Sequence, residues 1–166
     1  MNVMVTGLHG GKMSSSHSAE TKIEFLDDAE TVRRKIDQIS CEEGDGKNPV
    51  LLILRDVIFP ISLQRAESLA HEGATWEADP HNKPRPFITQ DAPQGTVFSI
   101  AGGEGGIPRH YTSFDHLQDD FVRGDISTEA LKAAVVGAFQ ALLDPIRAIY
   151  RDSQEWQAVD KLAYAD

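Results

Sequence analysis

The stretch STEALKAAVVGAFQALLDPIRAIY, residues 127–150, is the longest segment of this chain with helical hydrophobic periodicity. Its apolar positions recur at spacings of three and four residues, which places them on one face of an α-helix. That face is formed by Leu131, Val135, Ala138 and Leu142. We therefore expect a long helix packed against the core, and a mainly α-helical fold built around it.

Helical signals also lie on both sides of this stretch. The predicted helices begin near Asp28, at Pro49, at Thr112 or Ser113, and at Gln154. In the first, Val32, Ile36 and Ile39 form the apolar stripe, and Arg33, Arg34 and Lys35 are expected on the opposite side. The second, PVLLILRDVIF, is expected to end at Pro60, and the third at Gly124. The last is expected to run to Ala163 with Trp156 and Val159 facing inward.

The region between about residues 64 and 110 has a different composition. It is rich in proline and glycine, and its apolar runs PFIT and GTVFSIAGG are short and β-like. Such runs, bounded by turn residues, indicate strands rather than helices. The predicted fold is a helical bundle carrying an irregular insertion at about 64–110, with a small β-hairpin in it.

Composition narrows the possible functions. The 166 residues carry a formal charge of −10, so only local basic patches could hold a nucleic acid. A single cysteine, Cys41, excludes an internal disulfide framework and favours a reducing compartment. No apolar run or signal pattern suggests a membrane partner, and the six histidines show no zinc-like spacing. We expect a cytoplasmic protein without a bound metal.

The N-terminal sequence GGKMSSS, residues 10–16, has the residue types of a phosphate-handling loop. Glycine lets the backbone approach closely, Lys12 supplies a point charge, and the serines supply hydrogen-bond donors. Such a loop can stabilise a triphosphate as pyrophosphate departs. The spacing is not that of a Walker loop. A serine-rich terminus, or a cluster modified by kinases, is the alternative interpretation.

Longer segments carry a resemblance to a known family. TGLHGGKMSSS and TKIEFLDDAETVRRKI resemble the signature loop and the following segment of class I aminoacyl-tRNA synthetases. With CEEGDGKNPVLLILRDVIFP and YTSFDHLQDDFVRGDISTEALKAAVVGAFQALLDPIR, the order of segments is most similar to tyrosyl-tRNA synthetases of the eukaryotic and archaeal type. These segments cover about two-thirds of the chain.

The resemblance implies a domain organisation and an activity. Residues 1–27 would end a catalytic domain whose nucleotide and tyrosine sites are expected to be missing here, and residues 28–166 would form the anticodon-binding domain. The intact enzyme would activate L-tyrosine with ATP and Mg²⁺ and transfer it to tRNA(Tyr), as a homodimer. The chain alone is expected to be an inactive monomer that binds no cofactor.

The resemblance also implies site residues. The catalytic set is Lys12, Ser14, Ser15 and Ser16, and the ATP-binding set is Gly11, Lys12, Met13 and Ser14. The family reads the first anticodon base with a His-Pro-x-Asp pattern, which here is Ser127, Thr128, Glu129 and Ala130. Ala130 replaces the carboxylate, so Glu129 is the expected substitute, while Ser127 and Thr128 could instead cap the helix.

The remaining expected tRNA contacts are Lys132, Arg109 and Phe98. Phe98 is the nearest aromatic to the position of the family's stacking residue, and the alternative is a core position in the hairpin. Two other functions stay open at this point: a tryptophanyl-type synthetase, and a helical protein-interaction module without an RNA role.

Overall fold

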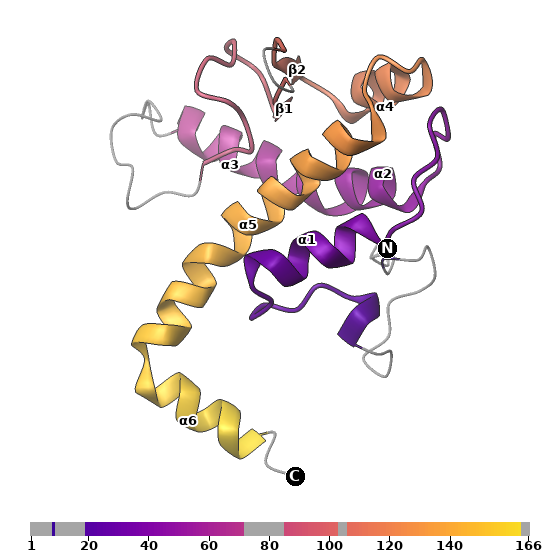
Figure 1. Ribbon diagram of the computed structural model, residues 1–166. Coiled ribbons are helices and arrows are strands. Elements are labelled where there is room, and N and C mark those ends of the chain that lie inside the picture. The colour runs from indigo at the N-terminus through magenta and orange to yellow at the C-terminus, as the bar shows by residue number, and fades with distance from the viewer. Residues whose placement is uncertain (1–7, 9–18, 72–84, 103–105, 164–166) are drawn as a thin grey trace, which may run out of the picture.

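The computed structural model describes Leu8 and residues 19–71, 85–102 and 106–163. The fold is mainly α-helical, as predicted, with α5 running across the other helices (Figure 1). The helical elements are the 3-10 turn η1 (Ala19–Thr21), α1 (Ala29–Asp37), α2 (Pro49–Ile53), the π-helix η2 (Leu54–Ile58), α3 (Phe59–His71), α4 (Phe114–Val122), α5 (Thr128–Asp152) and α6 (Gln154–Ala163).

Helix starts follow the capping signals of the sequence. The side chain of Asp28 accepts a hydrogen bond from Thr31 N at 2.7 Å and begins α1. Ser113 and Ser127 cap α4 and α5 in the same way, each accepting from a backbone N–H in the first turn. After α4, Gly124 has a φ of +80°, a conformation that glycine adopts without strain.

Pro60 does not end the second helical segment, contrary to the prediction. The chain passes from α2 into the π-helix η2, whose wider turn lets Phe59 N donate to Leu54 O. Pro60 then lies in the first turn of α3, where a missing N–H is tolerated. Helix α3 continues to His71, so the first residues of the predicted irregular insertion are helical.

The predicted hairpin forms with a different partner. β1 (Phe98–Ile100) pairs antiparallel with β2 (Arg109–Tyr111), in a register that sets Phe98 opposite Tyr111. The PFIT run contributes only an isolated bridge between Phe87 and Phe98. The insertion is therefore tied to the bundle through β1, whose residues are all buried.

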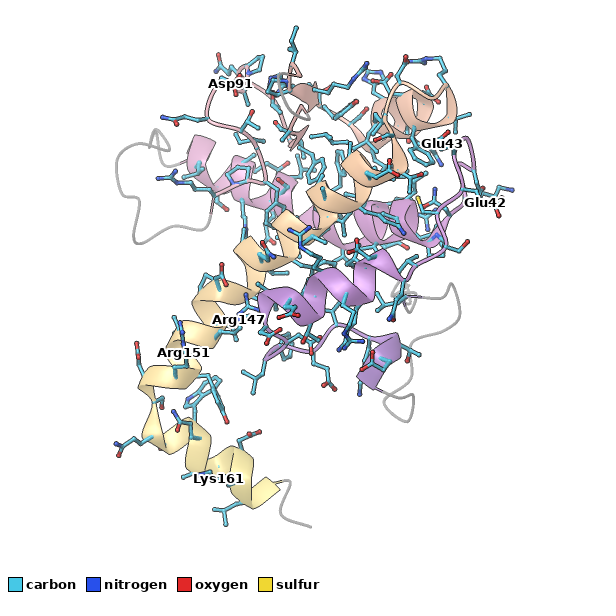
Figure 2. All side chains as sticks on the ribbon, in the orientation of Figure 1. Glu42, Glu43, Asp91, Arg147, Arg151 and Lys161 are labelled. Carbon is cyan, nitrogen blue, oxygen red and sulfur yellow. The ribbon has the colours of Figure 1, made fainter. Side chains whose placement is uncertain are left out.

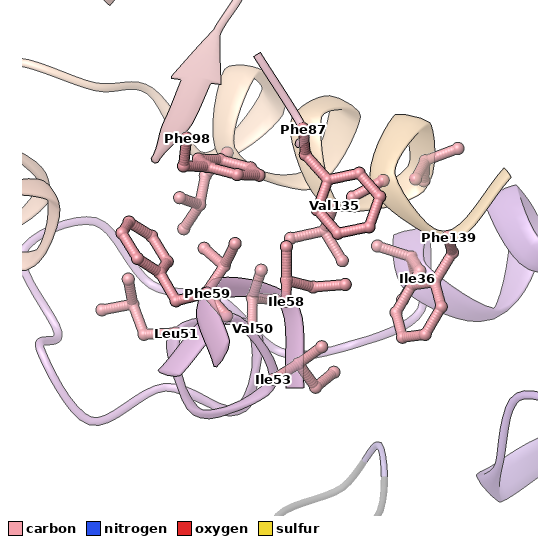
Figure 3. Packing of buried hydrophobic residues seen from close by; sticks show 14 of the residues in the cluster. Ile36, Val50, Leu51, Ile53, Ile58, Phe59, Phe87, Phe98, Val135 and Phe139 are labelled. Atoms are coloured by element: carbon pink, nitrogen blue, oxygen red, sulfur yellow. The ribbon is translucent and has the colours of Figure 1, made fainter. Parts of the chain in front are cut away.

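The hydrophobic core lies where α5 crosses α1, α2, η2 and β1 (Figure 3). Leu131, Val135 and Ala138 are buried as predicted, whereas Leu142 is half-buried and its neighbour Leu143 takes the core position. By length and composition alone α5 could cross a membrane. Its six buried side chains instead pack against the helices and strand around it.

Lys35 is buried, contrary to the expectation that it lies opposite the apolar stripe of α1. Its side chain is 2% exposed, and its Nζ lies 2.6 Å from Asp27 Oδ2 and 3.0 Å from Lys22 O. Lys35 lies three residues after Val32 and one before Ile36, on the same helical face. The segment before α1 folds back and supplies its partners.

α6 begins and ends at the predicted residues, but its apolar side chains do not face inward. Trp156 and Val159 are 58% and 60% exposed, and Leu162 is 81% exposed. The end of α5 and α6 extend away from the other helices in Figure 1. The apolar pattern of α6 therefore has no core to face among the described residues.

Candidate functional site

The start of α5 lies beside a groove of about 910 Å³. One wall is α5 itself, and the opposite wall is formed by Arg65 of α3, the segment 85–89, the start of β1 and the two residues that follow β1. Apart from Glu129, the lining residues on α5 are small and recur at helical spacing, ending in a proline. They are Ala130, Ala133, Ala134, Gly137, Ala138, Ala141 and Pro145.

Small side chains are what keep this groove open. A Cβ added at Gly137 would meet nothing within 4 Å, so the helix surface there faces empty space. The lining face of α5 from Ser127 to Pro145 corresponds to about 27 Å of helix. The groove is therefore long enough for more than one nucleotide-sized group.

The predicted anticodon-reading positions meet at the start of this wall. Ser127, Glu129 and Ala130 all line the groove. Glu129 is exposed in the first turn of α5, where the helix dipole favours a negative charge. Its carboxylate is a hydrogen-bond acceptor at the groove surface, and the alanine beside it leaves space.

Ser127 and Thr128 also have structural roles at the start of α5, where the alternative interpretation expected them to cap the helix. Ser127 Oγ accepts from Ala130 N at 3.2 Å. Thr128 Oγ1 donates to Cys41 O at 3.1 Å, which ties the start of α5 to the turn before α2. Burial raises the pKa of the half-buried Cys41 thiol. These bonds hold the helix start at a fixed place beside the groove.

The other three residues expected to contact tRNA make contacts within the protein instead. Phe98 is 1% exposed, and its ring centroid is 5.4 Å from that of Phe59, so the structure supports the core interpretation over base stacking. Lys132 Nζ donates to Asp37 O at 2.8 Å, at the end of α1. Arg109 pairs with Asp120 at 3.2 Å. The groove thus includes Phe98 only as its floor.

The sequence analysis did not assign Arg65 and Phe87, on the opposite wall, to the site. Arg65 of α3 lies with its guanidinium 4.7 Å from the ring centroid of Phe87, and its Nη1 donates to Arg85 O at 3.0 Å. Arg65 and Arg85 both line the groove. The alternation of alanine and glycine along α5 was a possible signal, but the facing wall could not be inferred from it.

The catalytic and ATP-binding residues expected from the resemblance lie outside the described residues. These are Gly11, Lys12, Met13, Ser14, Ser15 and Ser16. The segment that follows them is described, and several contacts attach it to the bundle. Lys35 pairs with Asp27, and Arg147 of α5 donates to Asp27 O. Figure 2 shows Arg147 where α5 passes this segment.

A second ion pair joins the same segment to α1. Arg34 makes two hydrogen bonds to the Glu20 carboxylate, at 2.5 and 3.2 Å, and both side chains are about half exposed. Leu8 is 4% exposed, and its N–H donates to Thr21 O at 3.2 Å. The chain on either side of the serine-rich loop is therefore attached to the helical body.

The sequence is similar to those of known proteins. Residues 1–144 match the family described as tRNA synthetases class I (W and Y). The cytoplasmic tyrosine–tRNA ligase of Danio rerio is 32% identical over 167 residues, covering 100% of this chain and 25% of that protein. The probable cytoplasmic tyrosine–tRNA ligase of Encephalitozoon cuniculi is 39% identical over 147 residues, covering 89% of this chain and 34% of that protein.

A likeness to a solved structure supports the fold. The tyrosyl-tRNA synthetase of Pyrococcus horikoshii, solved in complex with L-tyrosine, superposes with a TM-score of 0.64 at 21% identity, covering 93% of this chain and 38% of that one. The chain thus spans about a quarter to just over a third of the length of the proteins it matches.

Proposed function

Because this chain belongs to the class I tRNA synthetases of the tryptophan and tyrosine group, and its relatives are named tyrosine–tRNA ligases, we propose that it is part of a tyrosine–tRNA ligase. Its role is to bind the anticodon of tRNA(Tyr) in the groove beside α5. Residues 28–166 form the anticodon-binding domain. The intact enzyme activates L-tyrosine with ATP and joins it to the tRNA.

One observation carries the proposal: the groove brings together the three positions at the start of α5 that correspond to the family's reading pattern. Ser127, Glu129 and Ala130 share one surface, and a carboxylate is present there although Ala130 is not one. A carboxylate accepts hydrogen bonds from the ring N–H and amino group of guanine. In this role Glu129 is the residue that reads the first anticodon base.

The N-terminal loop supplies the second part of the proposed reaction. Lys12 neutralises charge on the phosphates of ATP, and Ser14, Ser15 and Ser16 donate hydrogen bonds as pyrophosphate leaves. Support comes from the segment after this loop, which the Lys35–Asp27 pair and Arg147 hold against α1 and α5. A substitution of Lys12 by alanine in the intact enzyme should slow tyrosine activation by about 10²–10³.

The test of anticodon reading is a binding titration of the chain with tRNA(Tyr) at low salt. A second tRNA differs only in the first anticodon base. We expect the changed tRNA to bind more weakly by roughly 1–3 kcal/mol, the usual value of one good base contact. The variant E129Q should lose most of this difference, because it replaces a charged acceptor by an amide.

A matched control is E30Q. Glu30 is also an exposed glutamate in the first turn of a helix, but it lies on α1 and away from the groove. Equal binding of the two tRNAs by the unmodified chain would refute anticodon reading by this domain. Discrimination that survives E129Q would assign the reading to another residue.

A further inference from the structure

Arg65 differs from most arginines of the described chain in its surroundings. The others with identified partners pair with carboxylates: Arg34, Arg55, Arg109, Arg123 and Arg147. Within the described residues no carboxylate lies within ion-pair distance of Arg65. Among the described residues, its hydrogen-bond acceptor is Arg85 O. Among the residues that the structure describes, Arg65 is therefore a cation without a counter-charge, in a chain whose net charge is −10.

The position of Arg65 makes this observation informative. The side chain is partly buried, and burial lowers the pKa of its guanidinium because water is removed from the charge. Taking a cation partly out of water without a carboxylate costs free energy that an anion at the same place would offset. Arg65 also lines the groove, so a ligand bound there can supply that anion.

The contacts of Arg65 fix its orientation. Its guanidinium lies over the Phe87 ring at 4.7 Å, and one nitrogen is held by Arg85 O. A guanidinium stacked in this way keeps further N–H donors in its plane, in the fork geometry that matches a phosphate. The Phe87 ring and the alanines of α5 place apolar surface beside this guanidinium, which strengthens a charged contact relative to open water.

We propose that Arg65 binds a backbone phosphate of the tRNA anticodon loop, next to the nucleotide that the start of α5 reads. This inference rests on the proposed function, because it takes tRNA as the occupant of the groove. The groove is long enough for neighbouring nucleotides, and Arg65 on its wall carries the charge opposite to that of their phosphates. Phosphate contacts position a nucleic acid without reading its sequence. Arg65 is therefore a positioning residue, and Glu129 is the specifying one.

The experiment measures binding of tRNA(Tyr) to the chain between about 50 and about 200 mM salt, with R65Q beside the unmodified protein. Loss of one phosphate contact should reduce the slope of log K against log salt by about 0.7. It should also weaken binding of the cognate and the anticodon-changed tRNA by the same factor. The control is R55Q, since Arg55 pairs with Asp56 and lies outside the groove; its slope should be unchanged.

A second variant guards against a folding defect in R65Q. R65K keeps the charge but loses the planar fork, so it should keep the salt slope while binding about threefold or more weakly. If the circular dichroism of R65Q shows that its fold is altered, the proposal is tested by comparing the tRNA affinity of R65K with that of the unmodified chain. An unchanged affinity of R65K would then overturn the proposal.

The outcomes separate this inference from the proposed function. Binding and base discrimination by the unmodified chain, with the same salt slope in R65Q, would overturn the role of Arg65 and leave anticodon binding in place. A loss confined to the cognate tRNA would also overturn it, because Arg65 would then be reading a base. No binding by the unmodified chain would overturn both.

Discussion

Removing the buried ammonium of Lys35 should destabilise the protein strongly. In K35M the methionine fills a similar apolar volume, but the Asp27 carboxylate, whose side chain is 10% exposed, loses the Nζ that lies 2.6 Å away. Breaking one partner of a buried pair costs about 3–5 kcal/mol, because the remaining charge is left without compensation. Asp27 Oδ2 still accepts from Glu24 N at 2.9 Å, so we expect the low end, about 3 kcal/mol.

The assay is urea unfolding followed by circular dichroism. The free energy of unfolding should fall through a lower midpoint at an unchanged m value, since the surface exposed on unfolding stays the same. The double variant K35M/D27N removes both charges and should recover most of the loss. The matched control is R34Q, which breaks the pair with Glu20 at similar geometry but at an exposed site, and should shift the midpoint little.

Two results would refute the reasoning. One is a loss below about 1 kcal/mol in K35M, which would mean that the pair is effectively solvated. The other is a double variant no more stable than K35M, which would mean that the uncompensated Asp27 charge is not the cause. Either result would also weaken the view that this pair holds the segment after the serine-rich loop against α1.

Four other substitutions at three positions test separate parts of the structure. Ser62 Oγ donates to Val97 O at 2.5 Å and accepts from Phe87 N at 2.8 Å, so S62A should lower the free energy of unfolding by about 1–3 kcal/mol in urea titrations. Burial, and then a hydrogen bond to a neighbouring carboxylate, raise the pKa of Tyr111. Y111F should therefore remove the last step of the phenolate titration at 295 nm. In the unmodified protein, the protonated phenol stabilises the fold below about pH 10, and this stabilisation should be lost as the pH rises further. Finally, G137A should stabilise the protein by about 0.5–1 kcal/mol because its Cβ meets empty space, whereas G137L should keep the fold and abolish tRNA binding by filling the groove.

Local signals predicted α1, α4 and α5 well because each rule acts within a few residues. A capping side chain starts each helix, and the apolar spacing defines the buried face. The same local rules failed at Pro60, because they do not anticipate a π-helical turn that places the proline in a new first turn. They also failed at Lys35, where residue type suggested solvent while helical position pointed inward.

Only part of the candidate site could be predicted from the sequence, because local patterns do not show which distant segments pack together. Ser127 and Glu129 lie at a helix start and could be located from a short pattern. Arg65 became part of the site only because the chain returns after α3 and places residues 85–89 beside it. Contacts across such sequence distances are set by packing, and no local pattern encodes them. Phe98 is the opposite case: the sequence placed it in the site because it lies near the position of the family's stacking residue, but in the structure it is buried in the core.

The three faces of α5 explain why this helix carries both the fold and the site. One face buries Leu131 and Val135 and packs against α1 and β1. A second face carries mostly alanine and glycine from Ala130 onward, and these small side chains leave the groove beside the helix open. Near its other end, Arg147 holds the segment that follows the serine-rich loop. Because one continuous helix makes all three contacts, an RNA bound in the proposed site would be positioned relative to that segment through α5.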